Sequence, residues 1–415
     1  MTGWVLRVLN RVSSLNRPTL RLTLALLCYH IPMRKNSFAA LKPDFETVIL
    51  PFLTSRSVLV LAGLLSYLFR ASESYPIPFA VQRGWQFTPI RVLDMWARWD
   101  TGWYYSIVGK GYLSAEGQSN LAFFPLYPFL IKASNYFLLD LHEHRTTFTL
   151  LAILIANLAF VGALLILSRI LAHIQLTPQH IRKTIWLIVI FPLSFFFSAA
   201  YTESIFLFFM AASLYFSLKR SWWLCALTAA LAVLTRPLAQ LIVIPIAVTY
   251  LAHNRFRIRW KDVAAFAVVP VLFFLYLWMQ YQVSGDWLAF LNIQSSWGHT
   301  ASTPWSTLFV SASGYPWLDL ISRLVVVLFI TLLVIYLWKY PHKEWGIFGV
   351  LLVTLPLFVG PSLSLGRYCI AVFPAYISLA GLIKDRPHLE RWVETFFLVT
   401  QAVFFAAWCR FYFVG

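Results

Sequence analysis

The feature that most constrains this chain is a series of long apolar segments that recurs along most of its length. A helix of about 20 apolar residues can span a bilayer, because it satisfies its own backbone hydrogen bonds there. The segments are continuous and do not alternate between polar and apolar residues, which argues against a β-barrel. The sequence therefore predicts an all-α, polytopic integral membrane protein. We expect spans near residues 54–70, 148–170, 184–200, 203–218, 222–252, 263–283, 319–338, 345–361, 367–383 and 394–412.

The composition agrees with this class. The chain is 60% hydrophobic and 12% charged, with a mean hydropathy of +0.71, whereas a soluble domain needs far more surface charge. Its net charge of +17 could indicate a nucleic-acid partner. In a membrane protein, however, lysine and arginine retain loops in the cytoplasm and contact anionic lipids. No soluble basic and aromatic module accompanies the charge, so we expect membrane lipids and no nucleic acid as partners.

Two segments depart from a simple span. The apolar run 222–252 is too long for one ordinary span and contains Arg236-Pro237. Proline interrupts a helix at the preceding residue, so we expect two membrane segments that meet at Arg236. Segment 121–139 is apolar but broken by proline, which favours a re-entrant or interfacial position. Together the segments predict about 10–12 transmembrane helices.

The distribution of lysine and arginine predicts the orientation. Residues 1–56 hold eight, and the loops near 169–183, 219–220, 253–261, 339–343 and 384–391 hold fourteen more, against eleven on the opposite side. The basic side is expected to be cytoplasmic, as is the N-terminus. Alternation of the spans then places five segments on the outer face: the long first loop 70–147, Tyr201–Glu203, the Arg236 break, the loop 284–318, and Gly360–Arg367.

The chain is expected to contain one transmembrane domain. Residues 1–53 are basic and predict a cytoplasmic or interfacial segment, in which Met1 and Met33 are alternative start sites. Residues 54–415 form the predicted domain, with extracytoplasmic loops at about 71–147 and 284–318. We expect short helices within the first of these loops.

The first predicted outer loop carries an aromatic stretch of mixed charge, Arg91–Tyr112, with two carboxylates, Asp94 and Asp100. Charges near lipid are costly, so this stretch is the first candidate for chemistry. On a helix, residues six apart differ by about 120° in direction, so the two carboxylates do not share a face. Asp94 is better explained by an ion pair with Arg91 or Arg98 at helical spacing.

Asp100 has two interpretations. A carboxylate flanked by indoles and an arginine can stay ionised yet partly desolvated, which suits a general base or a metal ligand. Alternatively, Asp100 caps a helix that begins at Thr101. Both can hold for the same residue.

Three further charged residues lie at span boundaries on the same predicted face. Glu203 is either a carboxylate of a substrate pocket or a favourable negative charge at a helix N-terminus. Arg236 is either a phosphate clamp or the partner of Glu203 in an ion pair. A snorkelling position is the other alternative for Arg236. The same alternatives apply to Arg367, which opens a later span.

The predicted loop 284–318 has no lysine or arginine but is rich in tryptophan, with His299 among its few polar groups. Such a surface suits a sugar or an isoprenoid chain, or else an interfacial aromatic belt. One histidine does not make a metal site, and neither HxxxH nor CxxC spacing occurs. Glycine-rich nucleotide-binding motifs are also missing from the sequence.

Three blocks of sequence resemble the PIG-V family, whose eukaryotic members are the second mannosyltransferases of GPI-anchor synthesis and which has bacterial relatives. The first block is Arg98-Trp-Asp100 … Tyr104 … Gly111-Tyr112 … Asn120-Leu-Ala-Phe-Phe-Pro-Leu-Tyr-Pro128. The second is Phe191-Pro192 … Phe196-Phe-Ser-Ala-Ala-Tyr201-Thr-Glu203-Ser, followed by Leu231-Ala-Val-Leu-Thr-Arg236. The third is Gly366-Arg367-Tyr368 with Phe373-Pro374.

The resemblance implies a GT-C fold with an extracytoplasmic active site and transfer of a sugar, usually mannose, with inversion. The implied donor is a polyprenyl-phosphate sugar such as dolichyl phosphate mannose, and the acceptor is lipid-linked or a glycan. The family's essential aspartate maps to Asp100. We expect Arg236 and Arg367 to bind the donor phosphate, without a required cofactor; a divalent metal is compatible with this reaction, but no residue pattern in the sequence supports one. Substrate-orienting roles are expected for Glu203, Asp94, Arg98, Trp99, Tyr201 and His299.

Two other functions compete with this one. A polytopic lipid or sugar transporter would also have a broken helix, but transporters often contain inverted repeats, and we find none. A non-catalytic subunit of a glycosylation complex is the second alternative. The favoured expectation is a multi-pass glycosyltransferase of a bacterial plasma membrane.

Overall fold

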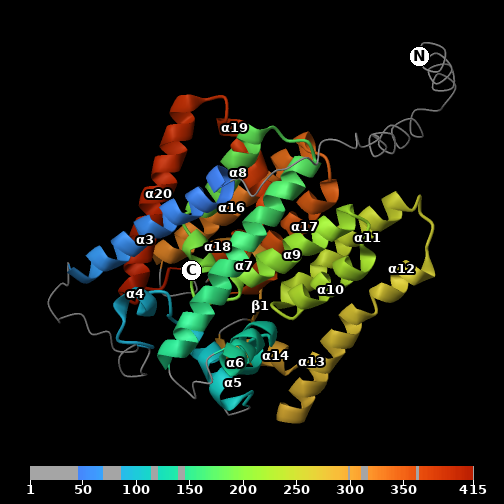
Figure 1. Cartoon of the computed structure of the whole chain (residues 1–415), viewed down its shortest axis with the longest axis horizontal. Helices are drawn as coiled ribbons and strands as arrows, with labels where there is room; N and C mark the ends of the chain where they lie inside the picture. Colours follow the sequence, from blue (N-terminus) through green and yellow to red (C-terminus); the bar gives the residue numbers. More distant parts are fainter. Residues whose placement is uncertain are drawn as a thin grey trace.

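The structure, a computed structural model, is almost entirely helical (Figure 1). It describes residues 45–68, 86–113, 120–138, 145–297, 300–309, 316–360 and 364–414. The predicted N-terminal segment and its two alternative start sites therefore lie outside the described residues, apart from the few that begin the first helix. Within the described ranges, five helical stretches are long and apolar enough to cross a membrane: Phe45–Leu68, Arg145–His173, Trp260–Ser284, Asp319–Lys339 and Pro387–Cys409.

The all-α, polytopic class is thus confirmed, and every predicted span coincides with one or more helices. These are the π-helix η1 (Phe45–Ile49) with α3 (Leu50–Leu68), α7 (Arg145–His173), α8 (Pro178–Ile190), α9 (Glu203–Leu218), α10 (Trp222–Val233), α11 (Val243–His253), α12 (Trp260–Ala265) with α13 (Val268–Ser284), α16 (Pro316–Lys339), α17 (Lys343–Thr354), α19 (Phe373–Ile383) and α20 (Pro387–Cys409).

Short elements lie between these helices, and the first predicted outer loop carries several of them, as expected. They are α4 (Arg91–Asp94), α5 (Thr101–Lys110), η2 (Asn120–Ala122), α6 (Leu126–Leu138), η3 (Ser194–Phe197), η4 (Pro237–Ile242), α14 (Ala289–Asn292), η5 (Ile293–Trp297), β1 (Thr300–Ala301), α15 (Pro304–Phe309), η6 (Leu355–Phe358), β2 (Val359–Gly360) and α18 (Leu365–Cys369).

Several helices end close to a proline. The predicted break at Arg236 is confirmed: α10 ends at Val233, Arg236 is extended, and Pro237 is the first residue of η4. The predicted span 184–200 is helical only to Ile190, because Pro192 follows and the chain continues in turns and η3. The predicted spans 345–361 and 367–383 are also interrupted near prolines.

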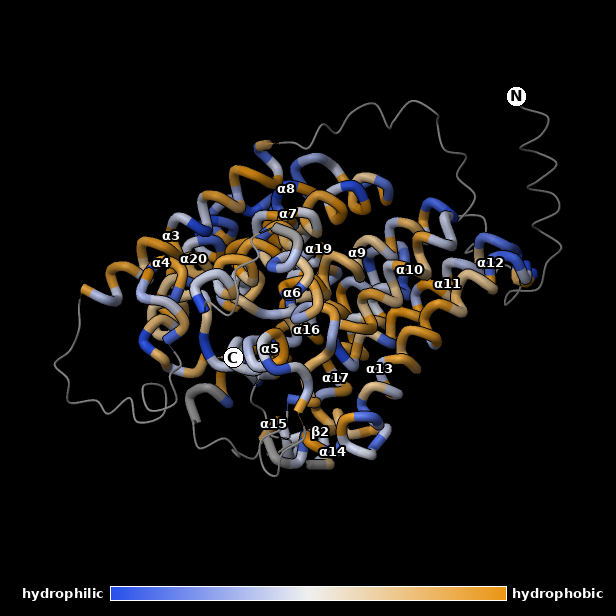
Figure 2. The backbone as a smooth tube through the Cα atoms, turned by 60° about the horizontal axis from the view of Figure 1, so that its bottom comes forward, coloured by the Kyte–Doolittle hydropathy of each residue, from blue (hydrophilic) through white to orange (hydrophobic). Residues whose placement is uncertain are grey.

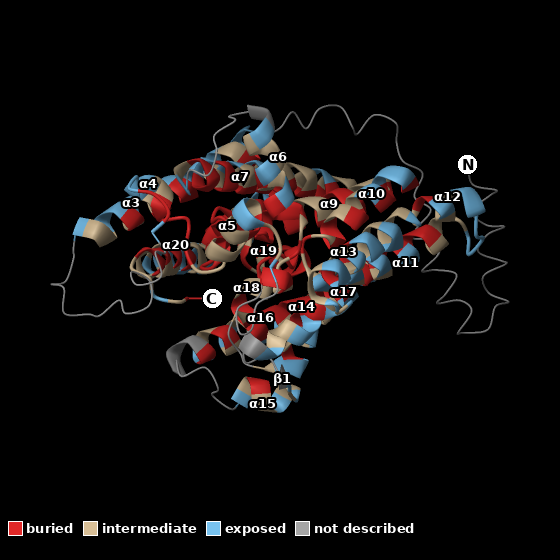
Figure 3. Ribbon diagram, turned by 90° about the horizontal axis from the view of Figure 1, so that it is seen from below, coloured by how far each residue is buried: buried red, intermediate tan, exposed pale blue. Residues whose placement is uncertain are grey.

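The helices pack in one bundle. Helix α7 packs against α9, α9 against α10, α3 against α20, and α16 against α17 and α19. Buried residues concentrate around α9, α18 and α19, while α11, α12 and α13 show exposed faces (Figure 3). Hydrophobic residues extend along most of the length of the long helices, and hydrophilic residues lie near the ends of α8 and α12 (Figure 2). An exposed apolar face of this kind suits contact with lipid.

The elements of the first outer loop gather at one end of the bundle, together with α14 and β1 (Figure 1). The Ala200 amide donates to the Trp96 carbonyl at 3.0 Å, and the Leu126 amide donates to Leu234 at 3.1 Å. Strand β1 pairs with β2 in antiparallel register, which joins the loop 284–318 to the segment before α18. The segments that charge and alternation predicted on one face therefore lie together, and this is where the candidate site forms.

Candidate active site

Four segment ends, distant in sequence, meet at this end of the bundle. Asp100 immediately precedes α5, Glu203 is the first residue of α9, Arg236 precedes η4, and Arg367 lies in α18. Ion pairs connect all four side chains into one cluster, which we call the charged tetrad. In the sequence, Glu203 and Arg367 lie at predicted span boundaries, Arg236 interrupts an apolar run, and Asp100 lies in the first predicted outer loop.

Arg367 is the centre of the tetrad. Its Nη1 donates to Asp100 Oδ2 at 2.8 Å, and its Nε lies 3.1 Å from Glu203 Oε1. The guanidinium carbon also lies 5.6 Å from the centre of the Phe196 ring and 5.2 Å from that of Tyr201. A planar guanidinium can hold two carboxylates at once in this way, which an ammonium group cannot reproduce.

Arg236 contacts the same oxygen of the Glu203 carboxylate. Its Nη2 pairs with Glu203 Oε1, and its Nε donates to the Thr202 hydroxyl at 3.1 Å. The Tyr368 ring lies 5.8 Å from the guanidinium carbon. The ion pair between Arg236 and Glu203, one of the alternatives drawn from the sequence, is therefore present. It fixes the position of Arg236 without excluding a phosphate ligand.

The tetrad is balanced in charge and mostly withdrawn from solvent. Two carboxylates face two guanidinium groups, so their formal charges cancel. The Glu203 side chain is 1% exposed and that of Asp100 is 20% exposed, while Arg236 and Arg367 lie between them. At partial burial these attractions are stronger than in water. Asp100 is the carboxylate of the pair that a substrate can most readily reach.

The backbone around Asp100 is held by Tyr201. The Asp100 amide donates to the Tyr201 hydroxyl at 3.1 Å, and this hydroxyl donates to the Arg98 carbonyl at 3.1 Å. Trp99, between them, adopts a left-handed φ of +47°, which a non-glycine residue rarely takes. Helix α5 begins at Thr101 as predicted, but the Asp100 side chain makes no capping hydrogen bond. The capping alternative is therefore wrong, because the carboxylate turns to Arg367 instead.

Asp94 and Arg98 form a separate, buried ion pair at 2.8 Å, with helical spacing as the sequence suggested. Asp94 Oδ1 also accepts from the Phe87 amide at 2.8 Å, and Arg98 Nη2 donates to the Tyr67 hydroxyl at 3.0 Å. The Arg98 side chain is 0% exposed. Since their polar groups face the protein, these two residues support the turn that carries Asp100, and the substrate-orienting role predicted for them stays a prediction.

Tyr104 adds a neutral hydroxyl beside the tetrad. Its side chain is buried and forms a hydrogen bond with the Thr202 hydroxyl. Burial raises the pKa of the Tyr104 phenol, and the nearby carboxylates of Asp100 and Glu203 raise it further. Tyr104 therefore keeps its proton at neutral pH. It continues the hydrogen-bonded series that begins at Arg236.

Sequence reasoning did not single out three of these neighbours. Thr202 binds Arg236 through its hydroxyl, while Phe196 and Tyr368 present aromatic rings to the two arginines. All three lie within the quoted blocks, so their position in the sequence was the available signal. His299 lies outside the described residues, and its predicted role stays a prediction. In the described part of the chain, no group of three or more His, Cys, Asp and Glu side chains could hold a metal.

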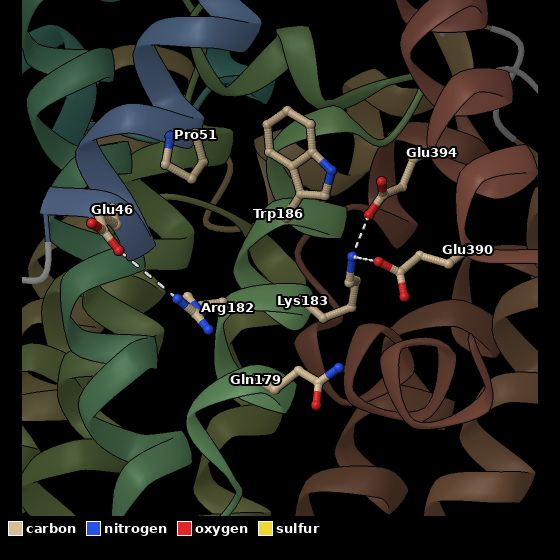
Figure 4. A pocket seen from close by; sticks show the side chains of 8 residues that line it. All are labelled: Glu46, Pro51, Gln179, Arg182, Lys183, Trp186, Glu390 and Glu394. Carbon is tan, nitrogen blue, oxygen red and sulfur yellow. Dashed lines mark hydrogen bonds and ion pairs between the residues drawn. The ribbon is translucent and has the colours of Figure 1, made fainter. Parts of the chain in front are cut away.

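A cavity of about 450 Å³ lies elsewhere, between η1 and the N-terminal parts of α3, α8 and α20 (Figure 4). Lys183 pairs there with Glu390 and, at 2.6 Å, with Glu394. From Glu390, α20 runs about 28 Å, at 1.5 Å per residue, to Cys409, whose carbonyl accepts from Arg98. The cavity is thus at the far end of the bundle from Asp100. It is lined by Glu46, Pro51, Gln179, Arg182, Lys183, Trp186, Glu390 and Glu394.

Comparison with known protein families identifies the chain. The family model described as Mannosyltransferase (PIG-V) matches residues 47–295, more than half of the sequence. The matched part contains Asp100, Glu203 and Arg236, while Arg367 lies beyond it. No curated protein matches the chain significantly. The match and the membrane-length helices together show that the protein is a multi-pass membrane mannosyltransferase that belongs to the PIG-V family.

Proposed function

We propose that this protein transfers mannose from a polyprenyl-phosphate donor to a hydroxyl group of a lipid-linked or glycan acceptor, at the extracytoplasmic face and with inversion. The observation that carries the proposal is the contact of Arg367 with both Asp100 and Glu203 at the junction of four segments. This junction combines a partly exposed carboxylate with two guanidinium groups. A base and an anion clamp are the two things that such a transfer needs.

Asp100 is the proposed general base. Its carboxylate takes the proton of the acceptor hydroxyl while the acceptor oxygen forms a bond to the anomeric carbon. The bond from that carbon to the phosphate oxygen breaks on the opposite face, and its electron pair leaves with the polyprenyl phosphate. Attack opposite the leaving group inverts the anomeric centre. General base catalysis of this kind contributes about 10²- to 10⁴-fold to the rate.

Arg367 connects the two ends of this reaction electrostatically. As the proton reaches Asp100, the carboxylate loses the charge that held Arg367 Nη1. At the same moment the departing phosphate gains negative charge. Arg367, together with Arg236, can then stabilise the negative charge of the leaving phosphate instead of that of the base. Such an interaction grows in the transition state, and only interactions of that kind accelerate the chemical step.

Glu203 keeps the two arginines in place during this change. Its Oε1 contacts both guanidinium groups. Its Oε2 is buried and makes no hydrogen bond within the described part of the chain, so a sugar hydroxyl can satisfy it. A positive clamp of two arginines lets the transfer proceed without a required cofactor. Donor binding must loosen the ion pairs of the tetrad, because their charges cancel in the structure as it stands.

The test uses purified protein, radiolabelled polyprenyl-phosphate mannose and a lipid or glycan extract. Asp100→Asn preserves the shape of the side chain but removes its basicity, and the transfer rate should fall by about 100-fold or more. Asp385→Asn, an exposed aspartate between α19 and α20, is the matched control and should keep the wild-type rate. Undiminished transfer by Asp100→Asn would refute the role of Asp100. Flux of donor into liposomes without any covalent product would favour a transporter instead.

A further inference from the structure

Helix α3 carries an arginine, Arg56, inside a membrane-length helical stretch, and the proposed mechanism does not use it. The residue is 7% exposed. Among the described residues it forms no ion pair with a carboxylate, so its partners are all neutral. An arginine inside an apolar helix is costly, and such residues rarely persist without a specific task. The partners of Arg56 indicate what this task is.

Arg56 binds the chain where helix α8 gives way to turns. Its Nη2 donates to the Val189 carbonyl at 3.1 Å, and its Nη1 donates to the Ser194 carbonyl at 3.3 Å and the Ser198 hydroxyl at 2.8 Å. The last carbonyls of a helix have no partner within the helix. In a membrane no water can replace that partner. Arg56 therefore supplies donors that the break at Pro192 makes necessary.

Gln401 of α20 completes the same network. Its Nε2 lies 3.0 Å from the Val189 carbonyl, 3.1 Å from that of Phe191 and 2.7 Å from the Ser194 hydroxyl. Its Oε1 accepts from the Ser55 hydroxyl at 3.0 Å. Two helices thus hold one irregular segment through side chains that are all buried. We call residues 191–202 the active-site turn.

The active-site turn leads directly to the tetrad. It contains Phe196 and Tyr201, whose rings contact Arg367, and it ends where Glu203 begins α9. The Tyr201 hydroxyl accepts from the Asp100 amide. A shift of the turn would therefore move the contacts of the base and of the clamp together. The two residues of the turn that Arg56 binds, Ser194 and Ser198, precede Tyr201 by only a few positions.

We propose that Arg56 is a positioning residue, which with Gln401 holds the active-site turn so that Tyr201 and Glu203 place Asp100 and Arg367 for mannosyl transfer. This inference rests on the proposed role of the tetrad. Arg56 touches no reacting group itself. A displacement of catalytic groups by about 1 Å can reduce a rate by about 100-fold. Loss of Arg56 should displace Asp100 and Arg367 in this way, so its effect falls mainly on the chemical step.

The experiment compares Arg56→Met and Arg56→Lys with the wild-type protein in detergent or nanodiscs. Amide hydrogen exchange, measured without substrate, should become about tenfold faster in the active-site turn of Arg56→Met, while α16 keeps its wild-type exchange. Arg56→Lys should be folded, with kcat lowered about 10- to 100-fold and the KM for the donor changed little. Ser213→Ala is the control, because it removes a buried hydrogen bond to the Cys225 carbonyl that does not lead to the turn. It should change neither the exchange of the turn nor kcat.

A double mutant tests whether Arg56 influences kcat through Ser198. If Arg56 acts through Ser198, then Arg56→Lys combined with Ser198→Ala should have a kcat within about twofold of Arg56→Lys alone. Unchanged kcat in folded Arg56→Lys, or wild-type exchange in Arg56→Met, would overturn the proposal, and losses that simply multiply in the double mutant would overturn the route through Ser198. Should Asp100→Asn stay active, the proposed function fails, yet the exchange measurement still decides whether Arg56 holds the turn.

Discussion

Replacing Arg367 by lysine keeps the charge of the tetrad but removes the fork that contacts two carboxylates. In the structure Nη1 reaches Asp100 at 2.8 Å and Nε reaches Glu203 at 3.1 Å. The ammonium group of lysine cannot contact both carboxylates, and where it stays on the buried Glu203, the charge-assisted hydrogen bond of Nη1 to Asp100 is lost. Such a bond contributes about 1.5–3 kcal/mol. At about 1.36 kcal/mol for each tenfold change in rate, the expected loss is about 10- to 150-fold.

The assay is steady-state transfer from radiolabelled polyprenyl-phosphate mannose, with the donor concentration varied. If Arg367 stabilises charge that develops on the leaving phosphate, kcat and kcat/KM should fall together while the KM for the donor stays nearly constant. Arg367→Met, which removes the charge as well, should fall further. Arg391→Lys, at an exposed position of α20, should match the wild type. A wild-type kcat for Arg367→Lys, or a change confined to KM, would refute this reasoning.

Two further outcomes follow from the geometry. Asp94→Asn leaves the fully buried Arg98 without a counter-charge and should lower the free energy of unfolding by about 3–5 kcal/mol, seen as a lower melting temperature in detergent. The double variant Asp94→Leu/Arg98→Met should recover part of the loss. A melting temperature of Asp94→Asn equal to that of the wild type would contradict a structural role. Transfer after exhaustive dialysis against a chelator should match the untreated rate, because two arginines supply the positive clamp, whereas a loss restored by a divalent ion would show that a metal takes part.

The chain order of apolar segments was enough to predict most of the fold. Each predicted span contains helix, and the Arg236-Pro237 break falls where proline chemistry placed it. The differences were local, and the largest ones lie near prolines: helices α8 and α17 end earlier than predicted near Pro192 and Pro356. Hydropathy does not register such an early end, because the residues that follow are still apolar. Near Pro192, donors from another helix, such as Arg56, bind the carbonyls that the end of α8 leaves without a partner.

The candidate site was predicted as a set of residues on one face, but not as an arrangement. The resemblance singled out Asp100, and the span boundaries singled out Glu203, Arg236 and Arg367. The sequence left two roles open for Asp100, since nothing local distinguishes a capping carboxylate from one directed to a distant partner. The partner is Arg367, which is 267 positions away. By contrast, helical spacing was enough to suggest the pair of Asp94 and Arg98, because these two residues are only four positions apart.

The sequence by itself therefore determined what depends on neighbours along the chain: the membrane class, the approximate spans, the helix break at Arg236-Pro237 and the family. The tertiary structure decided which charges meet. A bilayer gives unpaired charges and free backbone groups no water, so the ends of broken helices must find their partners in other segments. That requirement joins Asp100, Glu203, Arg236 and Arg367 into one tetrad and ties Arg56 to the turn beneath it.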